Sequence, residues 1–277
     1  MRFRLVTLNF WGVSEPLAGR LELAAEELIE HAPDAVCLQE VRPVDGRQGK
    51  TSAEVLAHRL GDYHVAYETS LRWDDDDFFP GHPGGEEGLA IVSRFPILEQ
   101  RCLKLPEARK TEARILLSAQ LETPAGPTWV HTTHLHWRLS DGIAREKQVL
   151  AIDEAIQGIQ SERPQLLCGD FNAEPDADEI RFMRGLATLD GRRTHYQDAW
   201  LRVNPTELGW TWAMSNANTG PLRRIDINRR IDYIFVTTRQ KGGAGTVYDC
   251  RLAFTGTDEQ GSYCASDHYG LIADVEL

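Results

Sequence analysis

Short strand-like segments alternate with helix-like segments along this chain, and this alternation restricts the possible folds more than any other feature. Apolar residues spaced three or four apart predict helices, and short apolar or alternating runs that stop at Gly or Pro predict strands. We predict helices over residues 17–31, 52–60 and 141–160, and strands over residues 2–8, 35–39, 63–67, 88–93, 97–105, 113–121, 128–136, 165–168, 231–236, 247–254 and 271–275. Strands that follow one another directly predict antiparallel pairing. We therefore expect an α/β fold with two sheets packed together and helices outside.

The size of the chain sets further limits. With 277 residues, 42% of them hydrophobic, it has the composition of a globular protein. A chain of this length can bury one large core, so one domain is as reasonable as two. No linker rich in Pro, Gly and Ser divides the chain, and we expect a single domain over residues 1–277. No apolar run reaches the ~20 residues of a membrane-spanning helix. No export signal is visible at the N-terminus, so a cytoplasmic location is expected.

The charge and the cysteines argue against particular partners and sites. A formal net charge of −12 repels nucleic acid at long range, which disfavours a protein that coats it. A nuclease is still possible because a bound divalent cation can reverse the local charge. The five cysteines have no Cys-x-x-Cys spacing, so neither a disulfide framework nor a zinc ribbon is predicted. Cys37 and Cys168 lie in apolar runs and are expected to be buried free thiols.

One segment, residues 72–87, has an unusual composition. It contains four consecutive aspartates, Asp74 to Asp77, followed by Phe78 and Phe79 and several glycines. We expect a solvated surface loop here, because carboxylates in tandem rarely converge on one cation. A metal site is the alternative, and the two phenylalanines leave open a lid or a contact with a membrane.

Polar side chains cluster where predicted strands begin or end. The sequences concerned are Thr7-Leu-Asn9, Leu38-Gln-Glu40, Thr133-His134-Leu135, Gly169-Asp170-Phe-Asn172, Arg230-Ile-Asp232-Tyr and Ser266-Asp267-His268. Each has a structural explanation on its own: a helix cap, a turn or, for Asp232, an ion pair with Arg229 or Arg230. No structural need accounts for all of them at strand ends, which is where α/β sheets collect ligands.

In their order and spacing, from residue 7 to residue 268, these motifs resemble the endonuclease/exonuclease/phosphatase superfamily. That superfamily includes deoxyribonucleases, abasic-site endonucleases, neutral sphingomyelinases, inositol polyphosphate 5-phosphatases and tyrosyl-DNA phosphodiesterases. The segments that begin at Gly88 and Arg114 also resemble its central strands. The resemblance implies a four-layer α/β sandwich, in which two mixed β-sheets pack face to face with helices outside. It also implies an enzyme that hydrolyses phosphoric esters with the help of a divalent metal.

The resemblance implies a role for each motif residue. Glu40 is similar to the principal metal ligand of the family, with Asn9 close to it and Asp267 completing the site directly or through water. Mg²⁺ suits such a sparse set of hard oxygen ligands, with Mn²⁺ as a possible substitute. Asp170 matches the residue that orients or deprotonates the attacking water. The other roles implied are a phosphate donor for Asn172, phosphate-side histidines for His134 and His268, and a carboxylate that fixes the His268 ring for Asp232.

These roles agree with the chemistry of attack on phosphorus. Negative charge accumulates on the non-bridging oxygens, so a metal, a histidine and an amide directed at them lower the barrier. A carboxylate beside an imidazole raises its pKa and selects one tautomer. The pair His134-x-His136 could suggest zinc, but no further zinc-type ligands follow, so zinc is not expected. His136 is expected at the pocket rim, and Arg145 and Gln148 are expected to be structural.

Substrate choice depends on the loops. Segment 209–229, together with Asp198-Ala-Trp200, resembles tyrosyl-DNA phosphodiesterases. Trp210 and Trp212 could stack on a base or sugar, or one or both could belong to the core. Arg223, Arg224, Arg229 and Arg230 could form a basic cluster for a second phosphate, or they could be solvated surface arginines. We assign substrate contacts to Arg114, Asn172 and Trp212. A small-molecule or lipid-headgroup diester is slightly favoured over DNA or RNA, and a non-catalytic binding module is the alternative of another class. The oligomeric state is left open.

Overall fold

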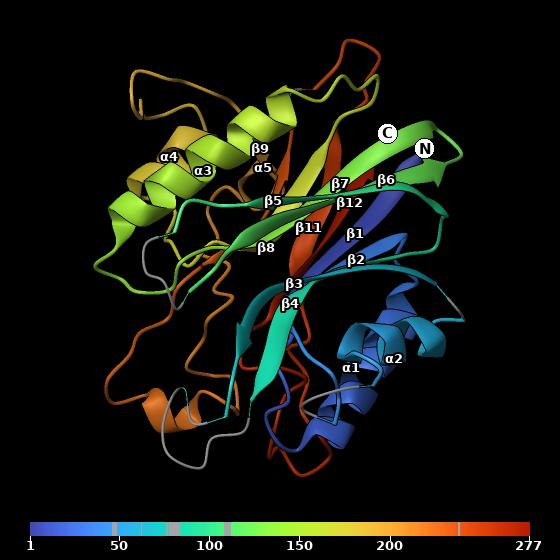
Figure 1. The fold of residues 1–277 in the computed structure, drawn as a ribbon, viewed down its shortest axis with the longest axis vertical. Coiled ribbons are helices and arrows are strands. Elements are labelled where there is room, and N and C mark those ends of the chain that lie inside the picture. The colour runs from blue at the N-terminus through green and yellow to red at the C-terminus, as the bar shows by residue number, and fades with distance from the viewer. Residues whose placement is uncertain (46–48, 62, 76, 78–83, 108–111, 238) are drawn as a thin grey trace.

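The structure is a computed structural model, which describes residues 1–45, 49–61, 63–75, 77, 84–107, 112–237 and 239–277 (Figure 1). The elements of its first half are β1 (Arg2–Asn9), α1 (Leu17–His31), β2 (Ala35–Val41), α2 (Ser52–Arg59), β3 (His64–Trp73), β4 (Gly85–Ser93), β5 (Ile97–Lys104), β6 (Ile115–Thr123) and β7 (Gly126–His134). Those of its second half are α3 (Gly142–Gln157), β8 (Leu166–Asp170), α4 (Asp178–Met183), β9 (Gln197–Asp198), α5 (Ala199–Val203), the 3-10 turn η1 (Gly220–Leu222), β10 (Asp232–Val236), β11 (Val247–Ala253) and β12 (Gly270–Glu276).

The strands form two six-stranded mixed sheets, as the sequence predicts. The first sheet has the order β11-β12-β1-β2-β4-β3, and the second has the order β5-β6-β7-β8-β10-β9. Within them, β1 pairs in parallel with β2, and β7 pairs in parallel with β8. Because parallel neighbours run in the same direction, Asn9 lies opposite Gln39 at one end of the first sheet and His134 lies opposite Asp170 at one end of the second. Each sheet thus presents polar residues at its strand ends.

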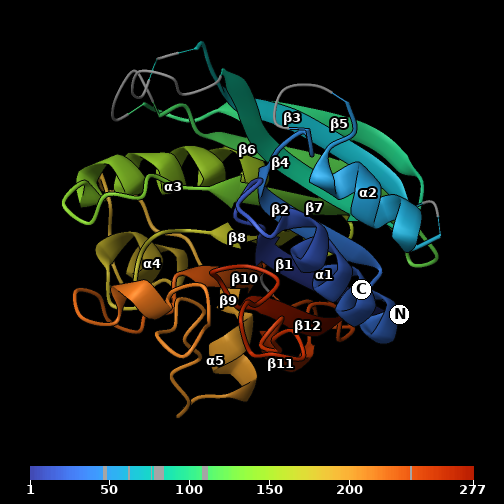
Figure 2. The same ribbon diagram turned by 90° about the horizontal axis from the view of Figure 1, so that it is seen from below.

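The sheets pack face to face, and helices cover their outer faces (Figures 1 and 2). Leu5 of β1 and Cys168 of β8 lie in the core between the sheets. Their neighbours in the chain point outward: Val6 packs with α1 and α2, and Leu167 packs with α3 and α4. Both faces of the central strands are buried, which explains the continuous apolar runs in β2, β8 and β10. The predicted four-layer α/β sandwich is confirmed.

The structure corrects the predicted boundaries of several elements. Helix α3 covers Gly142–Gln157 instead of residues 141–160. β3 continues to Trp73, where it pairs with Gly85 of β4, so both ends of the expected 72–87 loop belong to a hairpin. In the turn, the carboxylates of Asp75 and Asp77 accept hydrogen bonds from backbone N–H groups. Phe78 and Phe79 lie outside the described residues. α4, α5 and β9 are short elements that the pattern does not reveal.

In the described part of the chain, no helix is both long and apolar enough to cross a membrane.

Candidate active site

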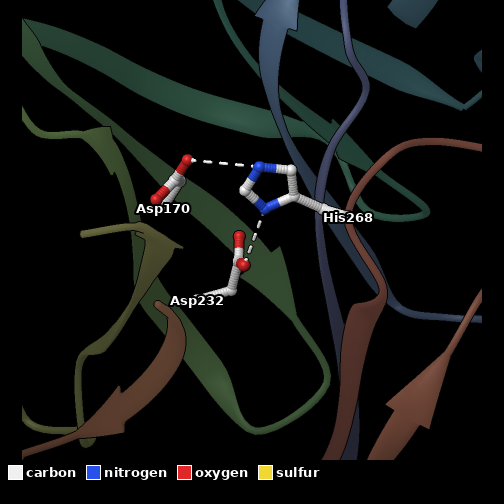
Figure 3. A group of neighbouring side chains, drawn as sticks. All are labelled: Asp170, Asp232 and His268. Carbon is white, nitrogen blue, oxygen red and sulfur yellow. Dashed lines mark hydrogen bonds and ion pairs between the residues drawn. The ribbon is translucent and has the colours of Figure 1, made fainter. Parts of the chain in front are cut away.

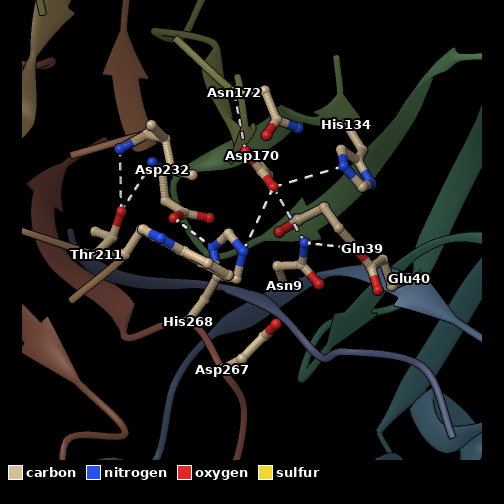
Figure 4. Close-up of polar contacts among 12 residues, drawn as sticks. Asn9, Gln39, Glu40, His134, Asp170, Asn172, Thr211, Asp232, Asp267 and His268 are labelled. Carbon is tan, nitrogen blue, oxygen red and sulfur yellow. Dashed lines mark hydrogen bonds and ion pairs between the residues drawn. The ribbon is translucent and has the colours of Figure 1, made fainter. Parts of the chain in front are cut away.

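The strand-end motifs of both sheets meet in one pocket of about 520 Å³. All the predicted site residues line it except Asn9 and Asp232, which contact residues of the lining directly. Figure 4 shows side chains from elements that are far apart in the sequence pointing toward one another: Asn9, Glu40, His134, Asp170, Asn172, Asp232, Asp267 and His268. Residues between positions 9 and 268 therefore converge on a single site.

An irregularity in β2 turns the Glu40 side chain into the pocket. The pairing of β2 with β4 shifts register between Leu38 and Val41, and Glu40 has φ = 54°, in the left-handed region. A bulge of this kind bends the strand and turns a side chain out of the regular alternation. Asn9 fixes the resulting carboxylate, since its Nδ2 donates to Glu40 Oε1 at 3.0 Å and to Asp170 Oδ2 at 3.1 Å.

The residues around Glu40 form a crowded acidic group. Burial, together with the negative charge of Glu40, raises the pKa of Asp267 to about 6 and that of Glu87 to about 7. Glu87, in β4, lines the pocket, although the motif analysis missed it. Its only signal was its position directly before the Gly88 strand. Across the described residues, no ion pair joins Glu40, Glu87 or Asp267 to an arginine or lysine.

These side chains fit a hard divalent cation. Carboxylate oxygens are the preferred ligands of Mg²⁺, and one cation would offset the negative charge of the group. Asn9 turns its amide NH₂ toward the carboxylates, and its Oδ1 already accepts from Trp11 N at 3.1 Å. It therefore holds the Glu40 carboxylate, and the second lone pair of Oδ1 is left for a cation.

His268 lies between two aspartates (Figure 3). Its Nδ1 is 2.9 Å from Asp232 Oδ2, and its Nε2 is 3.9 Å from Asp170 Oδ2. Burial lowers the pKa of His268, but the adjacent carboxylate of Asp232 outweighs it and holds that pKa well above its usual range. Asp232 pairs with His268 instead of the neighbouring arginines, because Arg230 pairs with Asp198 and Arg229 with Asp226. One atom from each of Asp170, Asp232 and His268 lies within 4.8 Å of the others.

Asp170 is held by several donors. Its Oδ1 accepts from Asn172 N at 2.8 Å, while its Oδ2 accepts from Asn9 and lies 3.5 Å from His134 Nε2. Burial and the charge of Asp232 raise the pKa of Asp170 to about 7. Burial and the positive charges of Arg114 and His268 hold the pKa of His134 well below its usual range, so this imidazole is neutral.

The Gly-Asp-Phe-Asn motif has a backbone explanation. Gly169 has φ = 143°, and a Cβ atom there would lie 2.0 Å from the Thr133 carbonyl oxygen, so only glycine fits beside β7. Asn172 has φ = 50°, and its Nδ2 donates to Leu135 O at 3.2 Å. The left-handed conformation, which asparagine tolerates better than most residues, keeps its side chain at the pocket.

The model of the Endonuclease/Exonuclease/phosphatase family matches residues 6–268. The chain belongs to this family. Nocturnin of Drosophila melanogaster is 26% identical over 282 residues, which is 93% of this chain and 42% of that protein. Sphingomyelin phosphodiesterase 5 of Danio rerio is 25% identical over 195 residues, which is 61% of this chain and 34% of that protein. The chain thus spans less than half the length of these curated relatives.

Solved structures of the family share the fold. Danio rerio TDP2 complexed with a single-strand DNA product superposes with a TM-score of 0.75 and 21% identity, covering 100% of this chain and 99% of that one. An endonuclease/exonuclease/phosphatase from Beutenbergia cavernae gives a TM-score of 0.74 with 23% identity, covering 100% and 72%. At these identities the likeness concerns the fold alone.

The pocket wall of this family member includes an aromatic and basic group. The Trp212 ring lies 5.1 Å from the His268 ring at 66°, and Trp212 Nε1 donates to Asp226 Oδ2 at 3.1 Å. Arg229 donates to the same oxygen at 2.7 Å and lies over the Trp212 ring. Trp210 is 40% exposed and does not line this pocket.

The predicted four-arginine cluster is wrong. Arg230 is buried and paired with Asp198, and Arg223 donates to the carbonyl of Met214. Only Arg229 of the four lines the pocket, together with Arg114 from the segment before β6. A second phosphate therefore has fewer cations to contact than the sequence suggested.

His136 is also misplaced by the sequence analysis. β7 ends at His134, and His136 is fully buried beyond it, between the carboxylates of Glu112 and Asp141. It is not at the pocket rim, because it bonds inward to these acids. Arg145 and Gln148 are structural, as predicted: Arg145 pairs with Glu179 at 2.5 Å and Gln148 accepts from His136 N at 3.1 Å.

Proposed function

We propose that this chain is a divalent-metal-dependent hydrolase that directs water at a phosphodiester, with residues 1–277 acting as one catalytic domain. The observation that carries the proposal is the meeting of an acidic group (Glu40, Glu87 and Asp267) with the His268, Asp232 and Asp170 cluster across one pocket. Membership of the family supports the same chemistry. We name Mg²⁺ as the cation, with Mn²⁺ as a substitute.

The metal half of the site consists of Glu40 and Asp267, with Asn9 holding the Glu40 carboxylate. A bound divalent cation would supply positive charge next to the non-bridging oxygens of the phosphate. Asn172 and Arg114 line the same pocket, and we assign them as donors to those oxygens. Their N–H groups stabilise charge that develops on the phosphate during attack.

The other half of the site, Asp170, His268 and His134, accepts and donates protons. Asp170 is positioned to orient the attacking water and to accept its proton, because its carboxylate is fixed by Asn9 and Asn172. The charged ring of His268, fixed by Asp232 at Nδ1, directs Nε2 into the pocket and donates to a phosphate oxygen. Neutral His134 has an imidazole N–H available as a donor to the leaving group or the phosphate.

We favour a small-molecule or lipid-headgroup diester as substrate. The pocket of about 520 Å³ is the size of a compact ligand site, and the net charge of −12 opposes a long polyanion. A relative that covers 61% of this chain carries the name sphingomyelin phosphodiesterase 5. A DNA or RNA nuclease, or a TDP2-like repair enzyme, is the second candidate, because TDP2 with a DNA product shares the whole fold. The presence of Glu40, Asp170, His134 and His268 together in one pocket argues against a non-catalytic binding module.

The test is a hydrolysis panel with Mg²⁺ or Mn²⁺: sphingomyelin, bis-nitrophenyl phosphate, inositol phosphates, supercoiled DNA, abasic DNA and RNA. We expect turnover of a compact diester that chelation abolishes and added metal restores, with His268→Ala as the inactive control. Faster cleavage of a nucleic acid would favour the second candidate. No hydrolysis of any member by the folded, metal-loaded chain would refute the proposed activity.

A further inference from the structure

Arg20, in the first turn of α1, is a buried cation that the proposed chemistry does not use. Its side chain is fully buried, and in the described part of the chain no carboxylate forms an ion pair with it. A guanidinium has five N–H donors. Their acceptors are the backbone carbonyls of Phe10 (2.6 Å), Ser14 (2.9 Å), Ala265 (2.9 Å), Gly12 (3.0 Å) and Trp11 (3.2 Å). Every donor is thus directed at the backbone.

These carbonyls belong to two segments that carry the metal half of the site. The 10–14 segment directly follows Asn9, and Ala265 lies two residues before Asp267. Ser266 makes a second tie between the same segments, because its Oγ donates to the Asn9 carbonyl at 2.6 Å. Arg20 therefore fixes the backbone on both sides of the gap between Asn9 and Asp267.

The link from Arg20 reaches the Glu40 carboxylate through two residues. Arg20 holds the carbonyl of Trp11, whose φ of 61° is unusual for a tryptophan. The Trp11 N–H donates to Asn9 Oδ1 at 3.1 Å, and this bond orients the amide that donates to Glu40. A shift in the 10–14 segment would therefore move Asn9 and release Glu40.

The positive charge of Arg20 also interacts with the carboxylates of the acidic group. The guanidinium lies over the rings of Phe10 and Trp11 at 4.9 and 5.2 Å. Burial lowers the pKa of Arg20 to about 10, so it remains charged at neutral pH, and the nearby charges of Asp267 and Glu40 oppose that lowering. Burying a cation without an ion-pair partner is costly. Here the positive charge of Arg20 is close enough to Asp267 and Glu40 to interact with both carboxylates.

We propose that Arg20 is a positioning residue for the divalent cation, one that sets the spacing between the Asn9–Glu40 pair and Asp267 without touching cation or substrate. The inference rests on the proposed function, because it requires that the acidic group binds a metal. Outer residues that orient metal ligands commonly change metal affinity by about 10- to 100-fold.

The test measures Mn²⁺ binding to the metal-free chain without substrate, by the loss of the free Mn²⁺ electron paramagnetic resonance signal. Arg20→Lys keeps the charge but offers only three donors, and we expect its Kd for Mn²⁺ to rise about 10-fold or more. Arg20→Met removes charge and donors and should raise the Kd further. Arg145→Lys is the matched control: Arg145 is also buried and donates to two backbone carbonyls, but these belong to His136 and Arg138. Its Tm should fall while its Kd stays at the wild-type value.

The outcomes separate the inference from the proposed function. An unchanged Kd in Arg20→Lys would overturn the positioning role, and so would an equal loss of affinity in Arg145→Lys. If the wild-type chain binds no Mn²⁺, the proposed metal dependence itself fails. If Arg20→Lys does not fold, the same Kd is measured for Arg20→Gln, which removes the charge but keeps a side-chain amide as donor. A rise of its Kd supports the inference, and an unchanged Kd contradicts it.

Discussion

The two sheets supply unlike halves of one pocket. The metal-side half, from the first sheet, comprises Asn9, Glu40, Glu87 and Asp267, and the proton-side half, from the second sheet, comprises His134, Asp170, Asn172 and Asp232. Carboxylates of the metal side are crowded together, and among the residues that the structure describes none of them forms an ion pair with an arginine or lysine. On the proton side, Asp170 and Asp232 each contact an amide or an imidazole.

This difference indicates that the carboxylates of the two halves are stabilised in different ways. Crowded carboxylates become stable when an external cation binds, whereas carboxylates held by hydrogen bonds are already fixed in position. His268 links the halves: it precedes β12 of the first sheet, but its ring bonds to Asp232 of the second. The comparison therefore predicts that mutations in the two halves will fail in different ways.

The largest effect is expected for the proton-side half. Asp170→Asn keeps the size of the side chain but cannot accept the proton of the attacking water. We expect kcat to fall by about 10²- to 10⁴-fold, with no recovery at high Mg²⁺, in steady-state assays on a generic diester. Recovery of turnover at high Mg²⁺ would place Asp170 in the metal-side half and break the comparison.

A mutation in the metal-side half should behave differently. Glu40→Gln removes one charge from the acidic group, and we expect the Mg²⁺ concentration for half-maximal activity to rise about 10- to 100-fold. Saturating Mg²⁺ should restore part of the rate. The measurement is a Mg²⁺ titration after chelation, with Asp170→Asn as the parallel sample. A fall in kcat with an unchanged metal requirement contradicts the assignment.

A smaller effect is expected at the pocket wall. Trp212 lies edge-on against His268 and lines the pocket. Trp212→Ala should raise KM by about 10-fold for a substrate with a base or ring, because stacking contributes ~1–3 kcal/mol. KM for a small alkyl diester should change less. Equal changes for both substrates would show that the ring acts only as support for His268.

The smallest effect on turnover is expected from His131, which lies in β7 three residues before His134. It is bonded to Ser118 and Gln165 in the core, and burial lowers its pKa to about 4. Below about pH 6.5 His131 is protonated in the unfolded chain but stays neutral in the folded chain. The free energy of unfolding therefore falls as the pH falls toward 4. The difference in unfolding free energy between wild type and His131→Gln should shrink by about 2 kcal/mol from pH 7 to pH 5, measured by urea titration. A constant difference would contradict the low pKa.

Local patterns were sufficient for most of the fold. Helix α1 covers the predicted residues 17–31, and the predicted strands all exist, because apolar periodicity reports directly which side chains are buried. The short elements α4 and α5 were missed because one or two turns are too short to show a period. The extension of β3 to Trp73 depends on its partner β4, which no local pattern reveals.

For the pocket, the sequence by itself determined the motif residues, since each stands at the end of an apolar strand and together they match one family. Tertiary structure decided their partners. Asp232 pairs with His268, Arg230 pairs with Asp198, and Glu87 joins the acidic group, all through contacts between distant segments. A sequence records which side chains are buried and which can carry charge, but the pairing of charges depends on distances that only the packing of the two sheets fixes.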